Sequence, residues 1–273
     1  GAELPSAAGR RYGEFVRRRL RREPLAYIVG VKGFRRIELA VDRRVLVPRP
    51  ETELLVEIAL ERRPGRVLDV GTGSGAIALA VADELPAAEV VATDTSAGAL
   101  EVARANAARL GLADRVHFEQ GTVPTDARGR PLARCEGLGS TAGASFDLVL
   151  ANLPYVAERD WAGLEPEVTD WEPREALLAG ADGLDAYRSL LARVRSNDRI
   201  ATETANAAGD TAGAPSGVRS SGRYAEVTAN AIAVEVGQGQ APAVAELVRE
   251  AGFPAIEVRE DLAGIERVVV GGR

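Results

Sequence analysis

Two short stretches carry the residues whose types and spacing could support chemistry. The first is Gly71-Thr72-Gly73-Ser74-Gly75, which joins an apolar segment to an alanine-rich one. A glycine-rich turn between a strand and a helix lets the backbone approach a ligand closely, and it directs free helix N–H groups toward that ligand. The stretch therefore predicts a ligand-binding loop.

An acid follows this loop at the distance typical of nucleoside cofactor sites. Asp94 ends the next predicted strand, roughly twenty residues after Gly71, and an acid there can accept both ribose hydroxyls. The loop pattern is G-x-G-x-G and not the G-x-G-x-x-G of dinucleotide binders. Together these features favour S-adenosyl-L-methionine over NAD as the cofactor.

The second stretch is Asn152-Leu153-Pro154-Tyr155, at the end of the apolar segment 146–151. In a doubly wound sheet, ligands bind at the carboxyl edge where these two strands lie side by side. A planar nitrogen acceptor has a delocalised lone pair, so a site must orient its NH2 group by accepting the hydrogens, a role for the Asn152 oxygen and a backbone carbonyl. Pro154 stiffens the turn and Tyr155 supplies a flat apolar wall. We therefore predict Asn152, Pro154 and Tyr155 as catalytic residues, with Asn152 also beside the cofactor.

A third polar turn contains two prolines. Pro48 and Pro50 fix two φ angles and remove two N–H donors, so Arg49 is held extended before a helix. Such a turn could simply mark the start of the helix, but a stiff polar turn is also what a binding edge requires. We count Arg49 and Glu51 as candidate substrate-binding residues, together with the four residues from Asn152 to Tyr155.

The rest of the chain alternates between strands and helices, which must position these stretches. Predicted strands cover 66–70, 89–94, 116–118, 146–151, 231–236, 256–258 and 267–270, and predicted helices cover 76–82, 97–110, 184–194 and 242–251. Alternation of this kind predicts a parallel sheet with right-handed crossovers, and the short link between the last two strands predicts an antiparallel edge. His117 lies within a strand, which favours a core or hydrogen-bonded histidine over a catalyst.

Composition narrows the possible functions. With 273 residues, 46% of them hydrophobic, the chain can bury one large core, or one domain with a small appendage. A net charge of -6 argues against unspecific nucleic-acid binding and favours a small-molecule or protein substrate. One cysteine, Cys135, and one histidine exclude an internal disulfide and a Cys/His metal cluster. Without a long apolar run or a signal-peptide core, we expect a soluble, cytoplasmic protein.

Three further segments have distinct patterns. Residues 10–22 combine seven arginines with apolar residues at helical spacing, which predicts a basic amphipathic helix. Either the basic face of this helix is solvated while its apolar stripe packs, or the basic face is a docking site for ribosomal RNA or an acidic partner. Alternating apolar residues over 37–41 predict a hairpin. Residues 122–145 and 196–230 break the rhythm, and we expect weak order in both.

Six segments of the chain resemble the peptide chain release factor glutamine N5-methyltransferases. They are Glu23 to Ile28, Pro48 to Glu53, Asp69 to Gly75, Asn152 to Tyr155, Glu172 to Arg174 and Asp261 to Gly264. The Pro-Arg-Pro-Glu-Thr turn is the most specific, because it separates this family from the nucleic-acid adenine methyltransferases with an Asn-Pro-Pro-Tyr type of motif. The resemblance implies an α/β fold with a seven-stranded, mostly parallel Rossmann-like methyltransferase sheet over residues 48–273. A short N-terminal helical segment and a β-hairpin linker over residues 1–47 would stand in place of the family's larger helical domain.

The resemblance also implies an activity. A methyl group would pass from S-adenosyl-L-methionine to the side-chain amide nitrogen of the glutamine in the Gly-Gly-Gln motif of release factors, with no membrane partner and nucleic acid involved only indirectly, if at all. Carried over to this chain, Gly71 to Gly75 and Asp94 would hold the cofactor, and Asn152 to Tyr155 would hold the glutamine.

Two departures from the family pattern leave alternatives open. Leu153 stands where the family usually has a proline, and Thr122 and Val123 stand where it usually has an acid and a bulky residue near the adenine. An adenine N6-methyltransferase on DNA or RNA would share the planar-amine geometry, but it would need a basic groove or a target-recognition domain. A binding protein that keeps the cofactor without turnover is the other alternative.

Overall fold

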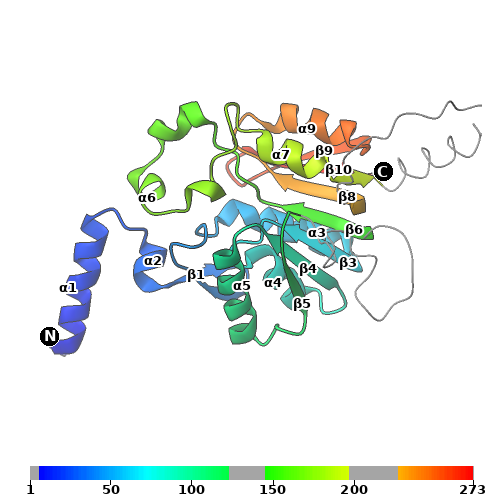
Figure 1. The fold of residues 1–273 in the computed structure, drawn as a ribbon. Coiled ribbons are helices and arrows are strands. Elements are labelled where there is room, and N and C mark those ends of the chain that lie inside the picture. Colours follow the sequence, from blue (N-terminus) through cyan, green and yellow to red (C-terminus); the bar gives the residue numbers. More distant parts are fainter. Residues whose placement is uncertain (1–5, 123–144, 197–226, 273) are drawn as a thin grey trace, which may run out of the picture.

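The computed structural model describes residues 6–122, 145–196 and 227–272, and within them one mixed sheet forms the centre of the molecule (Figure 1). The strand order is β5-β4-β3-β6-β8-β10-β9, with a short β7 paired to β8. These strands are β3 (Arg66–Val70), β4 (Glu89–Asp94), β5 (Val116–Gln120), β6 (Ser145–Ala151), β7 (Val194–Ser196), β8 (Val227–Glu235), β9 (Ala255–Glu260) and β10 (Glu266–Gly272).

The directions of the strands confirm the predicted topology. β3 pairs in parallel with β4 and with β6, whereas β10 runs antiparallel to both β8 and β9. The loops after β3 and β6 therefore meet at one edge. The predicted number of seven strands was one too low, because the segment predicted as the end of a helix forms β7. Val194 is fully buried there and pairs with Val227 of β8.

Helices cover both faces of the sheet, and the alternation of side chains along each strand explains why both faces are apolar. On β6, Leu148 and Leu150 join the cluster formed with α3, α4 and α5, whereas Val149 and Ala151 join the cluster formed with α7 and α9. The bounds of these helices are α3 (Glu53–Arg62), α4 (Ala76–Glu84), α5 (Ala97–Leu110), α7 (Asp185–Leu191) and α9 (Ala241–Glu250).

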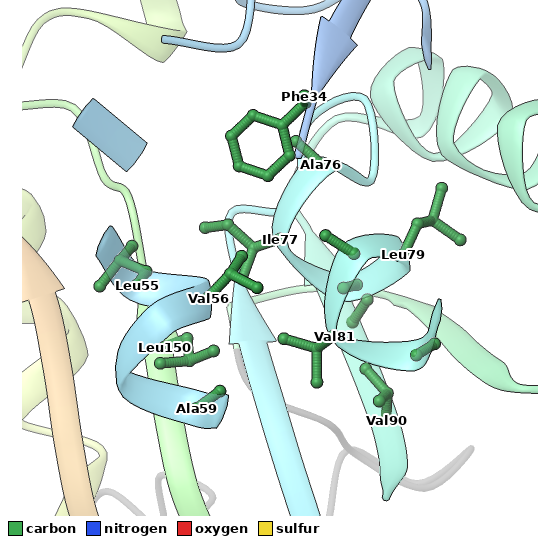
Figure 2. Close-up of a cluster of buried hydrophobic side chains, with 14 of the residues drawn as sticks. Phe34, Leu55, Val56, Ala59, Ala76, Ile77, Leu79, Val81, Val90 and Leu150 are labelled. Atoms are coloured by element: carbon green, nitrogen blue, oxygen red, sulfur yellow. The ribbon is translucent and has the colours of Figure 1, made fainter. Parts of the chain in front are cut away.

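The first of these clusters fixes the helix that follows the glycine loop. Figure 2 shows side chains of α3 and α4 packed together beside Leu150 of β6, with Phe34 at the upper end of the group. Every residue of α4 from Ala76 to Ala82 is buried, so the helix has no exposed face over its first two turns. The start of α4, and with it the glycine loop, is consequently held by packing on several sides.

The predicted hairpin is confirmed as β1 (Val31–Phe34) and β2 (Ile37–Ala40), which pair antiparallel. Asn106 of α5 anchors it, because its Oδ1 accepts from Ala40 N at 2.7 Å and its Nδ2 donates to Ala40 O at 3.0 Å. Phe34 and Leu39 belong to the same apolar cluster as α3 and α4. The division of the chain at residue 47 stays a prediction.

The arginine-rich helix is present as α1 (Ser6–Leu20), followed by α2 (Leu25–Val29), and it extends away from the sheet (Figure 1). Its apolar stripe is not packed, since Tyr12 is 68% and Leu20 is 78% exposed, so the interpretation of a stripe buried against the core was wrong. Ion pairs from Arg19 and Arg22 to Glu167 attach its end to the segment around α6 (Pro166–Thr169).

Other expectations have mixed outcomes. His117 is hydrogen-bonded as predicted, to Glu119 at 2.9 Å, but on the surface and not in the core. Most of the segments 122–145 and 196–230, together with Cys135, lies outside the described residues. Within the described ranges, no helix is both long enough and apolar enough to cross a membrane.

Candidate active site

A cavity of 270 Å³ lies at the carboxyl edge of the sheet. Its walls come from the turns that follow β3, β4, β5 and β6, from the segment before α3, and from the region around α7. The lining residues are Arg44, Val45, Leu46, Pro48, Thr52, Val70, Gly71, Thr72, Gly73, Ser74, Ala76, Ile77, Asp94, Thr95, Ser96, Ala99, Gly121, Thr122, Asn152, Leu153, Pro154, Pro173, Glu175, Ala176, Ala186 and Ser189. The two stretches singled out in the sequence therefore face one space.

The glycine loop requires glycine for two different reasons. Gly71, Gly73 and Gly75 all have positive φ, at 76°, 56° and 86°, which L side chains rarely adopt. A Cβ on Gly75 would also lie 2.8 Å from a carbon of Leu79, whereas one on Gly73 would meet nothing within 4 Å. Gly73 thus leaves room above the loop, and Gly75 allows the loop to enter α4. Gly75 itself does not line the cavity.

Asp94 lies at the end of β4 with its carboxylate fixed by backbone amides. One oxygen accepts from Gly73 N at 2.9 Å, and the other accepts from Ser96 N at 2.8 Å. Burial raises the pKa of this carboxyl group, and the amide donors act in the opposite direction. Each oxygen keeps lone-pair capacity for another donor, as a ribose hydroxyl would require.

Asp69 braces the loop from beneath. Its Oδ2 accepts from the Thr72 hydroxyl at 2.7 Å and from Ala78 N at 3.1 Å, and its Oδ1 has no hydrogen-bond partner within the described parts of the chain. Complete burial raises the pKa of Asp69 to about 7. Asp69 does not line the cavity, so its contribution is to the shape of the loop.

The Asn152 turn directly adjoins the glycine loop. A Cβ on Gly71 would lie 3.2 Å from Leu153 Cδ2 and 3.5 Å from the Asn152 carbonyl oxygen. Leu153 is 8% exposed and packs into the apolar cluster with Leu68 and Val70, which accounts for an apolar residue where the family usually has proline. The side-chain Nδ2 of Asn152 donates to Thr52 Oγ1 at 3.0 Å. Asn152 lines the cavity, and the other end of its amide, Oδ1, is a hydrogen-bond acceptor.

Tyr155 lies behind this turn and does not line the cavity. Gln240 holds its backbone, since Gln240 Nε2 donates to Tyr155 O at 2.9 Å and Oε1 accepts from Gly237 N at 3.0 Å. Burial raises the pKa of the Tyr155 hydroxyl, and the nearby charge of Glu235 adds to this effect. Its ring packs beside the cluster under α7 and α9.

The proline turn is extended at Arg49, as predicted, with φ -94° and ψ 146°. Arg49 points to Glu172, whose carboxylate accepts from its Nη2 at 2.9 and 2.7 Å. The Glu172 side chain is 2% exposed, so this pair ties the proline turn to the segment before Pro173. Neither Arg49 nor Glu51 lines the cavity, whereas Pro48 and Thr52 of the same turn do.

Sequence reasoning missed two residues of this site. Thr52 stands in the proline turn but was not assigned a role, and Glu235 ends β8 with only 1% exposure. An acid at the carboxyl end of a buried parallel strand was the signal that identified Asp94, and it applied equally to Glu235. Burial raises the pKa of Glu235 to about 7.

The residues present fit an adenosyl sulfonium cofactor. Open space lies above Gly73, Asp94 presents fixed acceptors that two ribose hydroxyls could use, and the cavity lining includes both Asp94 and the Asn152 turn. Gly71 to Ser74 and Asp94 could therefore hold such a cofactor, leaving the acceptor side to Asn152. Thr122 also lines the cavity, and its carbonyl accepts from the Thr93 hydroxyl at 3.0 Å.

Comparison with known proteins defines the class first. Residues 62–232 match the family model described as a methyltransferase domain. Among solved structures, the catalytic domain of hMettl16 in complex with a MAT2A 3′UTR hairpin has a TM-score of 0.54 at 15% identity, covering 86% of this chain and 75% of that one, a likeness of fold alone. The chain is a methyltransferase with a Rossmann-like α/β fold.

Curated relatives define the family. The release factor glutamine methyltransferase of Caulobacter vibrioides is 40% identical over 262 residues, which cover 94% of this chain and 76% of that protein. The release factor glutamine methyltransferase of Cereibacter sphaeroides is 38% identical over 266 residues, covering 97% of this chain and 80% of that protein. The chain belongs to the release factor glutamine methyltransferase family.

Proposed function

We propose that this chain transfers a methyl group from S-adenosyl-L-methionine to the side-chain amide nitrogen of the glutamine in the Gly-Gly-Gln motif of peptide chain release factors. The observation that carries the proposal is the contact between the two loops, because the Asn152 backbone carbonyl and the Leu153 side chain adjoin Gly71 and both loops line one cavity. Family membership supports the substrate class.

Different residues of the chain bind the cofactor and orient the acceptor. Gly71 to Ser74 and Asp94 bind and orient the cofactor. When bound, S-adenosyl-L-methionine would supply a methyl group on a positively charged sulfur, so that the acceptor nitrogen would form the new N–C bond as the C–S bond breaks to a neutral thioether and the displaced amide proton passes to solvent. Asn152 Oδ1 and a backbone carbonyl of the turn accept the two hydrogens of the substrate amide, which turns one face of its nitrogen toward the methyl group.

Positioning supplies most of the catalysis in this proposal. An amide nitrogen is a weak nucleophile, and the methyl donor is already activated, so holding the reacting atoms in line contributes more than a strong general base. Pro154 fixes the direction of the turn, and Leu153 anchors it in the core. Tyr155 supports the turn from behind, and Arg49, which pairs with Glu172, and Glu51 stay candidate substrate-binding residues of the proline turn.

The test is methyl transfer from labelled S-adenosyl-L-methionine to a release factor, repeated with the motif glutamine changed to alanine. We expect label on the unaltered factor and none on the altered one. A DNA and an RNA substrate run in parallel test the alternative of an adenine methyltransferase. Label that persists on the altered factor, or that appears only on nucleic acid, contradicts the proposal.

A further inference from the structure

Glu235 is a buried acid that has no assigned role in the proposed methyl transfer. It is the last residue of β8, and the parallel pairing of Ala151 with Val234 places it level with Asn152 on the neighbouring strand. Glu235 is 1% exposed, and its Oε2 has no hydrogen-bond partner in the described parts of the chain. A carboxyl group in such a place is costly to bury, so its retention calls for an explanation.

The Thr52 hydroxyl connects this acid to the acceptor turn. Thr52 is 3% exposed, its hydroxyl lies close enough to the Glu235 carboxyl group to lower the pKa of that group, and its Oγ1 accepts from Asn152 Nδ2 at 3.0 Å. A threonine hydroxyl has one hydrogen to donate and lone pairs to accept with. When that hydrogen points to Glu235, a lone pair faces Asn152, so only the NH2 end of the Asn152 amide can lie against Thr52.

This arrangement decides which end of the amide faces the substrate. Without the carboxylate, the Thr52 hydroxyl could rotate and donate to Asn152 Oδ1, which would present the NH2 end to the cavity. An NH2 group there cannot accept a hydrogen from a substrate amide. Thr52 and Asn152 both line the cavity, whereas Glu235 does not, so Glu235 acts through Thr52 and has no direct contact with the ligand space.

We infer that Glu235 is a positioning residue for methyl transfer, which through the Thr52 hydroxyl holds the Asn152 carboxamide with Oδ1 toward the acceptor. The inference rests on the proposed function for its kinetic readout. It also specifies the acceptor class, because an Oδ1 locked in this way selects substrates that donate, such as the NH2 group of a primary amide.

The packing around Glu235 supports a precise placement. Tyr187 donates its hydroxyl hydrogen to Glu235 O at 2.8 Å, so the backbone of this residue is fixed from α7. On the opposite side β10 pairs with it, as Val268 lies across from Glu235. The charged side chains that act on its carboxyl group are Glu51, Arg49 and Arg267. The backbone that carries this carboxyl group is therefore held on both sides.

The experiment compares Glu235→Leu, Glu235→Gln, Thr52→Val and the Thr52→Val/Glu235→Leu double variant in the full chain. We expect Glu235→Leu to lower kcat about tenfold, the loss of one hydrogen bond to a charged group, with the Kd for S-adenosyl-L-methionine within about twofold of the parent. Glu235→Gln should recover most of that loss, because its amide oxygen still accepts from Thr52. In the Thr52→Val background, Glu235→Leu should lower kcat little further, since the hydroxyl that connects Glu235 to Asn152 is already absent.

A purely structural Glu235 gives a different result. The loss would then follow the fraction of folded protein measured by circular dichroism, and it would persist undiminished in the Thr52→Val background, which overturns the inference. If Glu235→Leu does not fold, kcat can still be compared between Thr52→Ser and Thr52→Val, because serine keeps the hydroxyl group at position 52 and valine removes it.

A second measurement does not depend on turnover. In protein labelled with 15N-asparagine, the Asn152 side-chain amide signal, assigned by its loss in Asn152→Ala, should shift in Thr52→Val and in Glu235→Leu but little in Thr52→Ser. A signal that neither variant moves overturns the inference even if methylation proceeds. If the parent methylates no release factor but the signal shifts as expected, the proposed substrate fails and the positioning role stands.

Discussion

The two halves of the cavity are built from different material. The cofactor half consists mainly of backbone, with Gly71 and Gly73 at positive φ and amide donors that fix Asp94. The acceptor half consists of side chains from distant segments, since Thr52, Asn152 and Glu235 precede α3, follow β6 and end β8. Because of this difference, we expect cofactor binding to change little when side chains beside the glycine loop are altered. Methyl transfer, in contrast, should respond to the loss of a single side-chain group in the acceptor half.

The largest effect is expected at Asn152. Asn152→Ala should lower kcat roughly a hundredfold, about 3 kcal/mol of lost transition-state orientation, while cofactor affinity stays near normal because the backbone half is intact. Steady-state methylation of a release factor and calorimetry with S-adenosyl-L-methionine provide the two measurements. The matched control is Asn230→Ala, which removes the same side chain from β8, where Asn230 Nδ2 donates to Asp147 Oδ1 at 3.1 Å away from the cavity. Unchanged turnover in Asn152→Ala removes this residue from the mechanism.

The next effect belongs to the cofactor half. Asp94→Ala should weaken binding of S-adenosyl-L-methionine roughly thirtyfold, the order expected for losing charged acceptors to two hydroxyl groups. Asp147→Ala is a matched control, because Asp147 also accepts from two backbone amides, those of Gly65 and Arg66, but at the other end of the sheet. Equal losses of affinity in the two variants would show that Asp94 acts only through backbone structure.

The same difference explains what could be predicted from the sequence. The strand, the glycine loop, the helix and Asp94 follow one another in the chain, so a local pattern contained them, and the predicted ranges of β4 and α5 coincide with those of the structure. Thr52, Asn152 and Glu235 are far apart in the chain, and they come together only because β8 pairs with β6 and α3 packs against β8. Local patterns contain no information on that contact.

Arg49 shows how a correct local prediction can leave a role open. Its extended conformation followed from the two flanking prolines, but its partner Glu172 lies more than a hundred residues away. No pattern around Arg49 indicates that its guanidinium group faces a buried carboxylate. The exposed stripe of α1 illustrates the same limit, because helical spacing predicts a face but not what covers it.

Arg49 also tests whether the proline turn supports the acceptor half or binds substrate. Arg49→Ala should lower the free energy of unfolding by about 2 kcal/mol, less than for a fully buried pair because Arg49 is 30% exposed. Urea denaturation measures the change. The double variant Arg49→Ala/Glu172→Gln should recover part of the loss, since no unpaired buried charge remains. A fall in turnover with full stability would instead assign Arg49 to the substrate.

The smallest expected effect is on stability, and it distinguishes the two reasons why the glycine loop requires glycine, namely backbone conformation and close packing. Gly75→Ala and Gly111→Ala both place alanine at positive φ, 86° and 71°, which costs about 1 kcal/mol of stability. A Cβ at Gly111 meets nothing within 4 Å, whereas at Gly75 it would lie 2.8 Å from Leu79 Cδ1 and 3.4 Å from Ala103 Cβ. Leu79 is fully buried and cannot move aside freely, so Gly75→Ala should cost about 1 kcal/mol more than Gly111→Ala. Equal losses in urea denaturation would mean that backbone conformation alone sets the requirement, and that the loop can shift away from α4 without strain.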